Sequence, residues 1–255
     1  MNQSIINALN LLDLFTGDQH ELSLSDIHKV TDMSKPTVYR LLASLEFCGF
    51  LIKVKHSDQD IRYRLGLKLL ELGNIVSERL ELRRVALPHM EKLRDEINEI
   101  VHLVIINGDQ ATYIEKVESS QPIRLYTRIG RGSPLYIGSG PRLLFAYMSR
   151  ETRENLIQKM KLYPLTNNTI TDKTELRTEL ENIRRQGYAI SYGEQNMGTT
   201  GISFPVKDFT GEVVAALTIN GPSSFFEPGR ESFIREKSKG AADHISQDLG
   251  YKNQE

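Results

Sequence analysis

The chain has 255 residues, of which 39% are hydrophobic and 25% charged, which predicts a globular protein of two domains. No apolar run approaches the ~18 residues that span a membrane, and the first residues lack the features of a secretory signal, so we expect a cytoplasmic protein without a membrane partner. The single cysteine, Cys48, excludes an internal disulfide framework and a multi-cysteine zinc site, while the net charge of −1 leaves the class of partner open.

The N-terminal residues predict two helices in succession. Residues 4–15 carry apolar side chains three and four positions apart, which places them on one helix face. Ser23 is a suitable N-cap, and Asp26 lies where its carboxylate can reach back to that cap. A capping box of this kind predicts a short second helix over residues 24–31.

The same start signal repeats almost at once. Ser34 is expected to cap a third helix, Pro36 suits its first turn, and Gly49 suits its end. Cys48 is interpreted as a small core residue at the end of this helix rather than a reactive thiol. Two short capped helices with so short a connection are typical of a helix-turn-helix.

Small polar and basic side chains gather near the N-terminal end of this third helix. Arg40 is the best candidate for reading a guanine edge, and Thr37 and Tyr39 are candidates for phosphate contacts. The alternative is a solvated helix face with an ordinary cap. The residues of this helix predicted to contact DNA are Ser34, Lys35, Thr37, Tyr39, Arg40 and Ser44.

Two β-like runs, residues 50–55 and 61–65, flank a polar turn and predict a hairpin that would form the wing of a winged helix-turn-helix. The first 64 residues carry slightly more acidic than basic side chains, so the DNA-binding prediction depends on where the charges lie. For Arg64, a phosphate contact and an ion pair within the domain remain equal alternatives. Phosphate contacts are predicted for Lys53, Lys55 and Arg62, although they could also be ordinary charges on an exposed hairpin.

Residues 67–80 predict a linker helix between a DNA-binding domain at 1–66 and a larger domain at 81–255. Strands joined by hairpins, with helices grouped together, predict an α+β fold with an antiparallel sheet for the larger domain. Its expected helices are 83–98, 143–148, 150–160, 172–186 and 228–249, and its expected strands are 100–106, 111–117, 123–127, 202–206 and 213–220.

A glycine-rich stretch at 130–140 matches neither a dinucleotide-binding fingerprint nor a nucleophile elbow, so a simple loop is its default interpretation. Backbone N–H groups at a helix start nevertheless favour anions, which makes Ser139 and Gly140 candidates for ligand contact. Arg128 is either a structural ion-pair partner or the counter-charge of a carboxylate ligand.

Few other residues carry recognisable chemistry. Thr218 and Asn220 are two positions apart on one predicted strand and therefore share a face, where they would contact a ligand or merely satisfy neighbouring backbone. The six histidines lack metal-ligand spacing, so each is interpreted as structural or solvated. We find no nucleophile–base–orienter set, and predict no catalytic residue, metal or cofactor.

Four stretches together resemble the IclR family of bacterial regulators over nearly the whole chain: ALNLLDLF, LSLSDIHKVTDMSKPTVYRLLASLEFCGFL, YRLGLKLLELG and GYAISYGEQNMGTTGISFPVKDFTGEVVAALTINGP. The resemblance implies a GAF-like effector domain and a dimer of dimers. The stretch YIEKVESSQPIRLYTRIGRGSPLY and the tail AADHISQDLGY are similar to the branch of hexuronate and pectin-degradation repressors that respond to 2-keto-3-deoxygluconate.

The sequence departs from the family's pattern around the implied pocket. Residues 138–143 read Gly-Ser-Gly-Pro-Arg-Leu where the family usually has Thr-Ala-x-Gly-Lys-Ala. Gly201 stands where many members have a cysteine or serine, and Ser191 where they have an aspartate. This implies a less acidic and more open pocket, suited to a larger ligand than a two- or three-carbon acid. The implied effector-binding residues are Arg128, Ser139, Gly140, Ser191, Gly201, Thr218 and Asn220.

These observations predict a ligand-responsive transcriptional regulator that binds a double-stranded DNA operator as a homo-oligomer. We expect a repressor of sugar-acid catabolism released by a keto-sugar acid such as 2-keto-3-deoxygluconate. One alternative is an enzyme, or another small-acid-binding protein, with a targeting winged helix, although no catalytic set supports an enzyme. Another is an RNA or protein interaction module, but the N-terminal region offers few of the stacking aromatics that single-stranded RNA readers use.

Overall fold

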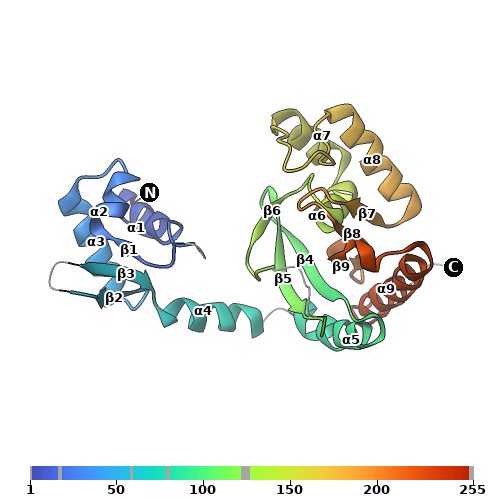
Figure 1. Cartoon of the computed structure of the whole chain (residues 1–255), viewed down its shortest axis with the longest axis horizontal. Coiled ribbons are helices and arrows are strands. Elements are labelled where there is room, and N and C mark those ends of the chain that lie inside the picture. Colours follow the sequence, from blue (N-terminus) through green and yellow to red (C-terminus); the bar gives the residue numbers. More distant parts are fainter. Residues whose placement is uncertain (1, 17–18, 58–59, 79–80, 122–126, 253–255) are drawn as a thin grey trace. The chain divides into compact units, whose positions relative to one another are not determined.

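The helices and strands fall into two units in the computed structural model of the protein (Figure 1). The structure describes residues 2–16, 19–57, 60–78, 81–121 and 127–252. The contacts within the chain divide it into Met1–Leu80 and Glu81–Glu255. The strand predicted at 123–127 falls almost wholly outside the described residues.

The N-terminal unit is a three-helix cluster with a small antiparallel sheet. Its core is formed by apolar side chains from each helix and from the hairpin, among them Leu11, Ile27, Leu42 and Tyr63. The sheet has the order β1-β3-β2, and the two-residue strand β1 was not predicted because it is too short to show alternation. The elements are α1 (Gln3–Leu12), β1 (Leu22–Ser23), α2 (Leu24–Lys29), α3 (Lys35–Phe47), β2 (Leu51–Lys55), β3 (Ile61–Leu65) and α4 (Leu67–Glu78).

The two predicted N-caps behave differently. The capping box of α2 forms as expected, with Asp26 N donating to Ser23 Oγ at 3.2 Å and Ser23 N donating to Asp26 Oδ2 at 3.1 Å. Ser34 occupies the N-cap position of α3, but its side chain makes no cap hydrogen bond, so that prediction was wrong in its detail. Pro36 at the second helical position has no N–H to donate, and Ser34 Oγ instead lies 2.9 Å from Thr37 Oγ1.

Cys48 is exposed, contrary to the expectation of a core residue. The apolar stripe of α3 ends at Leu45, and Cys48 is the C-cap, beyond the last turn that faces the core.

The C-terminal unit is built on one antiparallel sheet with the strand order β6-β5-β4-β9-β8-β7. The edge strands β6 and β7 are short, and neither was predicted. The antiparallel sheet itself confirms the predicted α+β class. The strands are β4 (Ile100–Asn107), β5 (Gln110–Val117), β6 (Gly132–Pro134), β7 (Ala189–Tyr192), β8 (Thr199–Lys207) and β9 (Val213–Pro222).

Helices cover both faces of this sheet (Figure 1). One face packs on α5 (Glu81–Ile97) and α9 (Pro228–Asp248). The other packs on α6 (Ser139–Tyr147), α7 (Arg150–Lys159) and α8 (Lys173–Gln186). Strand β9 alternates between these layers, with Leu217 and Ile219 in the first core and Ala216 in the second. Its residues Thr218 and Asn220 therefore lie on the side of α6.

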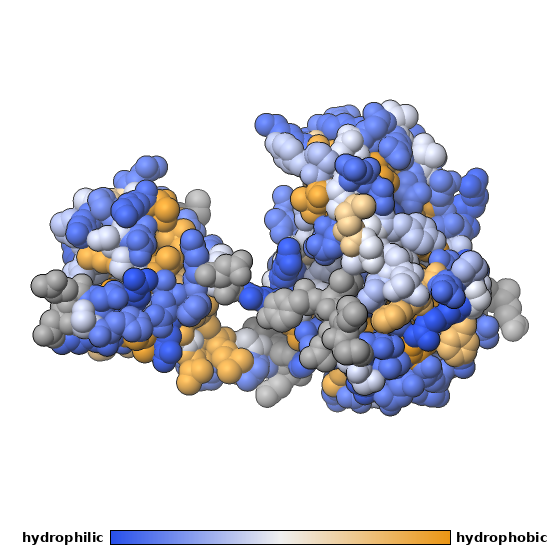
Figure 2. Space-filling model, viewed as in Figure 1, coloured by the Kyte–Doolittle hydropathy of each residue, from blue (hydrophilic) through white to orange (hydrophobic). Residues whose placement is uncertain are grey.

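Two helices of the N-terminal unit keep apolar side chains on the surface. On α4, Leu67 is 74% exposed and Leu70 is 60% exposed, and Figure 2 shows apolar side chains gathered over this helix. On α1, Ile5 and Leu9 are also more than half exposed. A unit of this size would normally bury such side chains or cover them with a partner. Within the described residues, no helix combines the length and the apolar character that crossing a membrane requires.

Candidate functional site

The predicted DNA-contacting residues of α3 lie mainly on its exposed face. Ser34, Lys35, Tyr39, Arg40 and Ser44 are exposed and Thr37 is half-buried, because Val38, Leu42 and Leu45 turn the opposite face of the helix to the core. Ser44 Oγ donates to Arg40 O at 2.9 Å, so its hydroxyl hydrogen is already used. Neither Lys35 nor Arg40 has an ion-pair partner among the described residues, which leaves both cations available to an external anion.

The cations of the hairpin β2–β3 divide between its two faces. Directly opposed residues of an antiparallel pair share a face. Val54 opposes Arg62, whereas Lys55 opposes Ile61, so Lys53 and Lys55 lie on one face and Arg62 on the other. Arg62 Nε also donates to Asp60 Oδ1 at 3.0 Å. The structure therefore brings Lys53 and Lys55 together and separates Arg62 from them.

A cavity of about 70 Å³ lies in the C-terminal unit, on the side of the sheet that α6 covers. Six of the seven predicted effector residues line it: Ser139, Gly140, Ser191, Gly201, Thr218 and Asn220. Arg128 does not; Arg131, three residues along the same loop, lines the cavity instead. The lining residues that sequence reasoning missed are Tyr113, Thr127, Arg131, Gly138, Gln195, Asn196 and Thr199.

Buried hydroxyl groups connect the elements around the cavity. Ser203 Oγ lies 2.8 Å from Ser139 Oγ and 2.9 Å from Thr218 Oγ1, which joins β8 to α6 and β9. Ser139 N donates to Ser191 Oγ at 3.1 Å, which joins α6 to β7. These contacts hold the polar lining in place on three strands and one helix.

Two glycines let the polar side chains approach the backbone. A Cβ at Gly201 would lie 2.6 Å from Asn220 Oδ1, 2.7 Å from Ser139 Oγ and 2.9 Å from Ser191 Oγ. A Cβ at Gly140 would lie 2.5 Å from Thr218 Oγ1. Real side chains avoid such distances, so any residue other than glycine at these positions would displace the lining. The space that a cysteine or serine at position 201 would need is thus taken by polar atoms from three other elements.

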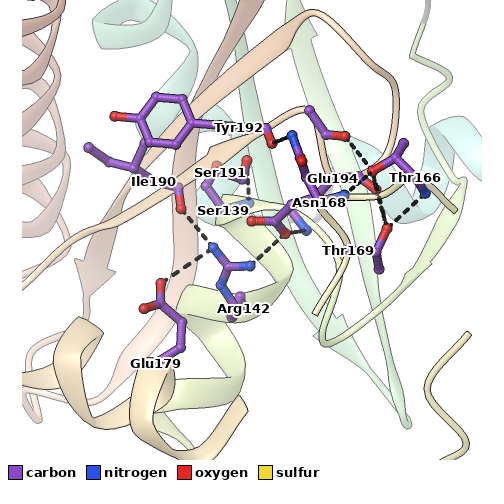
Figure 3. Close-up of polar contacts among 12 residues, drawn as sticks. Ser139, Arg142, Thr166, Asn168, Thr169, Glu179, Ile190, Ser191, Tyr192 and Glu194 are labelled. Carbon is purple, nitrogen blue, oxygen red and sulfur yellow. Dashed lines mark hydrogen bonds and ion pairs between the residues drawn. The ribbon is translucent and has the colours of Figure 1, made fainter. Parts of the chain in front are cut away.

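The N-terminus of α6 already holds a carboxylate of the chain (Figure 3). Glu194 Oε2 accepts from Gly138 N at 3.1 Å and from Arg142 Nη1 at 2.5 Å. Arg142 is 1% exposed; its Nη2 also donates to Ile190 O at 2.7 Å and lies 3.4 Å from Glu179 Oε1. Removing one partner of a buried ion pair typically costs ~3–5 kcal/mol, because the other charge stays buried without compensation.

This ion pair fixes the first residues of the loop that follows β7. Thr169 Oγ1 donates to Glu194 O at 2.7 Å, and Thr166 Oγ1 donates to Gly193 O at 2.6 Å (Figure 3). Gln195 and Asn196, which line the cavity, follow directly. The predicted anion site at the start of α6 therefore offers fewer free backbone amides than expected. Of the two candidate amides, Ser139 N donates to Ser191, and only Gly140 N lacks a hydrogen-bond partner in the part of the chain that the structure describes.

His102 on β4 lies beneath this lining. Asn220 Nδ2 is 3.1 Å from His102 Nδ1, and the Tyr113 ring packs against the imidazole with centroids 5.2 Å apart and planes at 75°. Burial, with a smaller contribution from the nearby Lys116 ammonium, lowers the pKa of His102 to about 3, so the imidazole is neutral. A lone histidine in an apolar strand is typical of a protein core, and sequence reasoning did not connect it with the site.

Comparison with protein-family models decides the class of this protein. Residues 4–54 match the IclR helix-turn-helix domain, and residues 75–247 match the model described as bacterial transcriptional regulator IclR C-terminal. The chain belongs to the IclR family. It is a ligand-responsive, DNA-binding transcriptional regulator, as the sequence predicts.

Two named relatives support this assignment. The chain is 38% identical to the HTH-type transcriptional regulator KipR of Bacillus subtilis (strain 168), over 98% of both chains. It is 32% identical to the HTH-type transcriptional regulator KdgR of Escherichia coli (strain K12), over 97% of this chain and 93% of the relative. Both are named as transcriptional regulators, which confirms the prediction of a regulator.

Solved IclR structures share the fold. The Thermotoga maritima IclR is similar with a TM-score of 0.78 and 30% identity, over 98% of this chain and all of that one. An IclR homologue from Microbacterium hydrocarbonoxydans, complexed with 4-hydroxybenzoate, has a TM-score of 0.82 and 28% identity, over 96% of this chain and 98% of that one.

Proposed function

We propose that this IclR-family regulator represses genes of sugar-acid catabolism and is released by a small polyhydroxylated carboxylic acid such as 2-keto-3-deoxygluconate. The observation that carries the proposal is the chemistry of the cavity. Its described lining consists of hydroxyls, amides and glycine backbone, with one cation, Arg131, and no carboxylate side chain. Such a lining offers many hydrogen bonds to ligand hydroxyls and attraction to one anion.

Two groups favour an acid among polyhydroxylated ligands. The Gly140 amide, at the positive end of the α6 dipole, is a donor for a carboxylate oxygen. Arg131 supplies a positive charge at the edge of the same cavity, where Arg128 was expected to act.

A second candidate is an aromatic acid, because a homologue of 28% identity is complexed with 4-hydroxybenzoate. The lining of this cavity favours the sugar acid. Tyr113 is the one aromatic side chain among its described lining residues, whereas a flat aromatic ring would leave most of the hydroxyls and amides without partners.

The volume of the cavity sets a condition on binding. About 70 Å³ holds a few water-sized molecules. A six-carbon acid is larger, so its entry requires the lining to move outward. Gln195 and Asn196 follow the anchored Glu194 and precede Gly198, whose φ is +73°, and we infer that this part of the loop moves.

The DNA-binding role belongs to α3 and the hairpin β2–β3. In the winged arrangement, the exposed face of α3 enters a major groove while the Lys53–Lys55 face of the hairpin follows a phosphate backbone. Such a protein acts where the chromosome lies, which supports a cytoplasmic location.

The effector is tested with Asn220→Leu and a matched control, Asn182→Leu, on α8 outside the cavity. A ligand at 100 times its Kd adds about 2.7 kcal/mol to stability, so 2-keto-3-deoxygluconate should raise the melting temperature of the wild type and weaken its operator binding. Asn220→Leu should abolish both responses but keep ligand-free operator binding. Asn182→Leu should respond like the wild type.

The same two responses, melting temperature and operator binding, are measured with pyruvate and with 4-hydroxybenzoate. A response to 4-hydroxybenzoate alone would replace the sugar acid with an aromatic one. A normal response of Asn220→Leu would place the effector outside this cavity.

A further inference from the structure

His102 is the one buried histidine of the described residues, and nothing in DNA binding uses it. It lies opposite Thr218 in the β4–β9 pair, so its side chain points to the cavity face of the sheet. Its imidazole touches two residues that line the cavity, Asn220 through a hydrogen bond and Tyr113 through ring packing.

We propose that His102 is a positioning residue that fixes the Asn220 amide with Oδ1 toward the cavity, so that the site selects an effector carrying a hydroxyl donor there. The inference rests on the proposed function, because it specifies how the effector pocket distinguishes its ligand. It assigns to Asn220 a single role, that of acceptor.

The geometry around the amide gives this direction. The Nδ2 atom of Asn220 is 3.1 Å from His102 Nδ1, while its Oδ1 lies toward Gly201, only 2.6 Å from where a Cβ at that position would be. An amide nitrogen always donates, so His102 Nδ1 must accept. Because Oδ1 accepts only, a ligand hydroxyl can bind there, whereas a ligand carboxylate or keto oxygen at the same point is repelled.

The tautomer of His102 follows from that hydrogen bond. With Nδ1 as acceptor, the proton of the neutral ring is on Nε2, and this nitrogen has no hydrogen-bond partner among the described residues. The charged groups that face the ring are Lys116, whose effect lowers the pKa, and Glu118, whose weaker effect raises it. The ring therefore keeps one neutral form at physiological pH, and Asn220 keeps one orientation.

The arrangement is tested first without an effector, by ¹⁵N NMR of the histidine rings in the full-length protein. The signal of His102 is assigned by its loss in His102→Asn. We expect the Nε2-protonated tautomer with an unprotonated, hydrogen-bonded Nδ1. The opposite tautomer would overturn the inference, because Nδ1–H would require Asn220 to present Nδ2 to the cavity.

Selectivity is tested with two acids that share a keto-acid group, 2-keto-3-deoxygluconate, which has hydroxyls, and pyruvate, which has none. By calorimetry, His102→Leu should weaken binding of the hydroxylated acid about tenfold, as expected for one lost hydrogen bond, and leave pyruvate affinity nearly unchanged. His102→Asn should restore the selectivity, because its Oδ1 occupies the place of Nδ1.

The outcomes separate the two levels of inference. Equal weakening of both acids in His102→Leu, or no rescue by His102→Asn, means a merely structural role and overturns the inference while the proposed effector stands. Failure of the wild type to bind either acid overturns the proposed effector and the hydroxyl selectivity with it. Thermal unfolding of each variant shows that it is folded before its affinities are compared.

Discussion

At the scale of the residue, His102 makes the free energy of unfolding depend on pH. Its pKa falls from 6.5 to about 3 on folding, chiefly because burial penalises the charged ring. Below pH 6.5 the unfolded chain therefore binds a proton that the native protein does not. The stabilising effect of the neutral ring is present above pH 6.5 and is lost as the pH falls toward 3.

We therefore expect wild-type protein to lose stability relative to His102→Asn on acidification. The difference in unfolding free energy should change by up to about 1.4 kcal/mol per pH unit below pH 6.5 and stay constant above it. Urea denaturation of both proteins from about pH 5 to pH 8 measures it, and the other histidines cancel. A difference independent of pH would mean that His102 titrates alike in the folded and unfolded chains.

The residues of the site also show where sequence reasoning succeeds. Thr218 and Asn220 were placed on one face by strand alternation, which does not depend on the rest of the fold. Arg128 was named and Arg131 missed, because which of the two lines the cavity depends on the conformation of the glycine-containing loop between them, for which no periodicity exists. His102 was missed because its role depends on its contact with Asn220, which lies on a paired strand but is far away in the sequence.

At the scale of the element, helices with caps and hairpins with turn residues were predicted close to their observed bounds. Their signals are local: the Ser23 capping box is contained in four residues. The short edge strands β1, β6 and β7 were missed, because their conformation is imposed by pairing with β3, β5 and β8. The failure of the Ser34 cap likewise came from a neighbour, since Pro36 removes one of the donors that the cap would bind.

The recognition helix and the hairpin should respond differently to mutation. Arg40→Ala should weaken operator binding by ~1–3 kcal/mol and relax selectivity at one base pair if the guanidinium reads a base edge. Lys55→Ala should weaken all duplexes alike and reduce the salt slope by ~1, since a phosphate contact carries no sequence information. Fluorescence anisotropy at several salt concentrations separates the two effects.

Two further variants complete this test. Arg62→Ala probes the opposite face of the hairpin. A larger loss of operator affinity for Arg62→Ala than for Lys55→Ala would mean that the face of Arg62 contacts the DNA. Lys68→Ala, on α4 where it pairs with Glu71, is the control that should bind normally. Unchanged affinity and selectivity of Arg40→Ala would contradict the assignment of α3 as the recognition helix.

At the scale of the whole molecule, one DNA-binding unit offers one α3 and one hairpin, and so contacts one half-site. Practical operator affinity requires two such units held together, because the second contact is then intramolecular. We propose that the exposed apolar side chains of α1 and α4 form the surface for this association: Ile5, Leu9, Leu67, Leu70, Leu72 and Ile75. Association through the C-terminal units as well would give the dimer of dimers implied by the family.

We therefore expect sedimentation velocity to show a dimer or tetramer at micromolar concentration. Leu70→Glu places a charge among the apolar side chains of α4, where burial against a partner would cost several kcal/mol. This variant should weaken operator binding severalfold and lower the association state, while each unit stays folded. Leu165→Glu, an equally exposed leucine in the C-terminal unit, is the matched control and should behave like the wild type. A wild type that sediments as a monomer with and without operator DNA would refute both the association and the role of α4 in it.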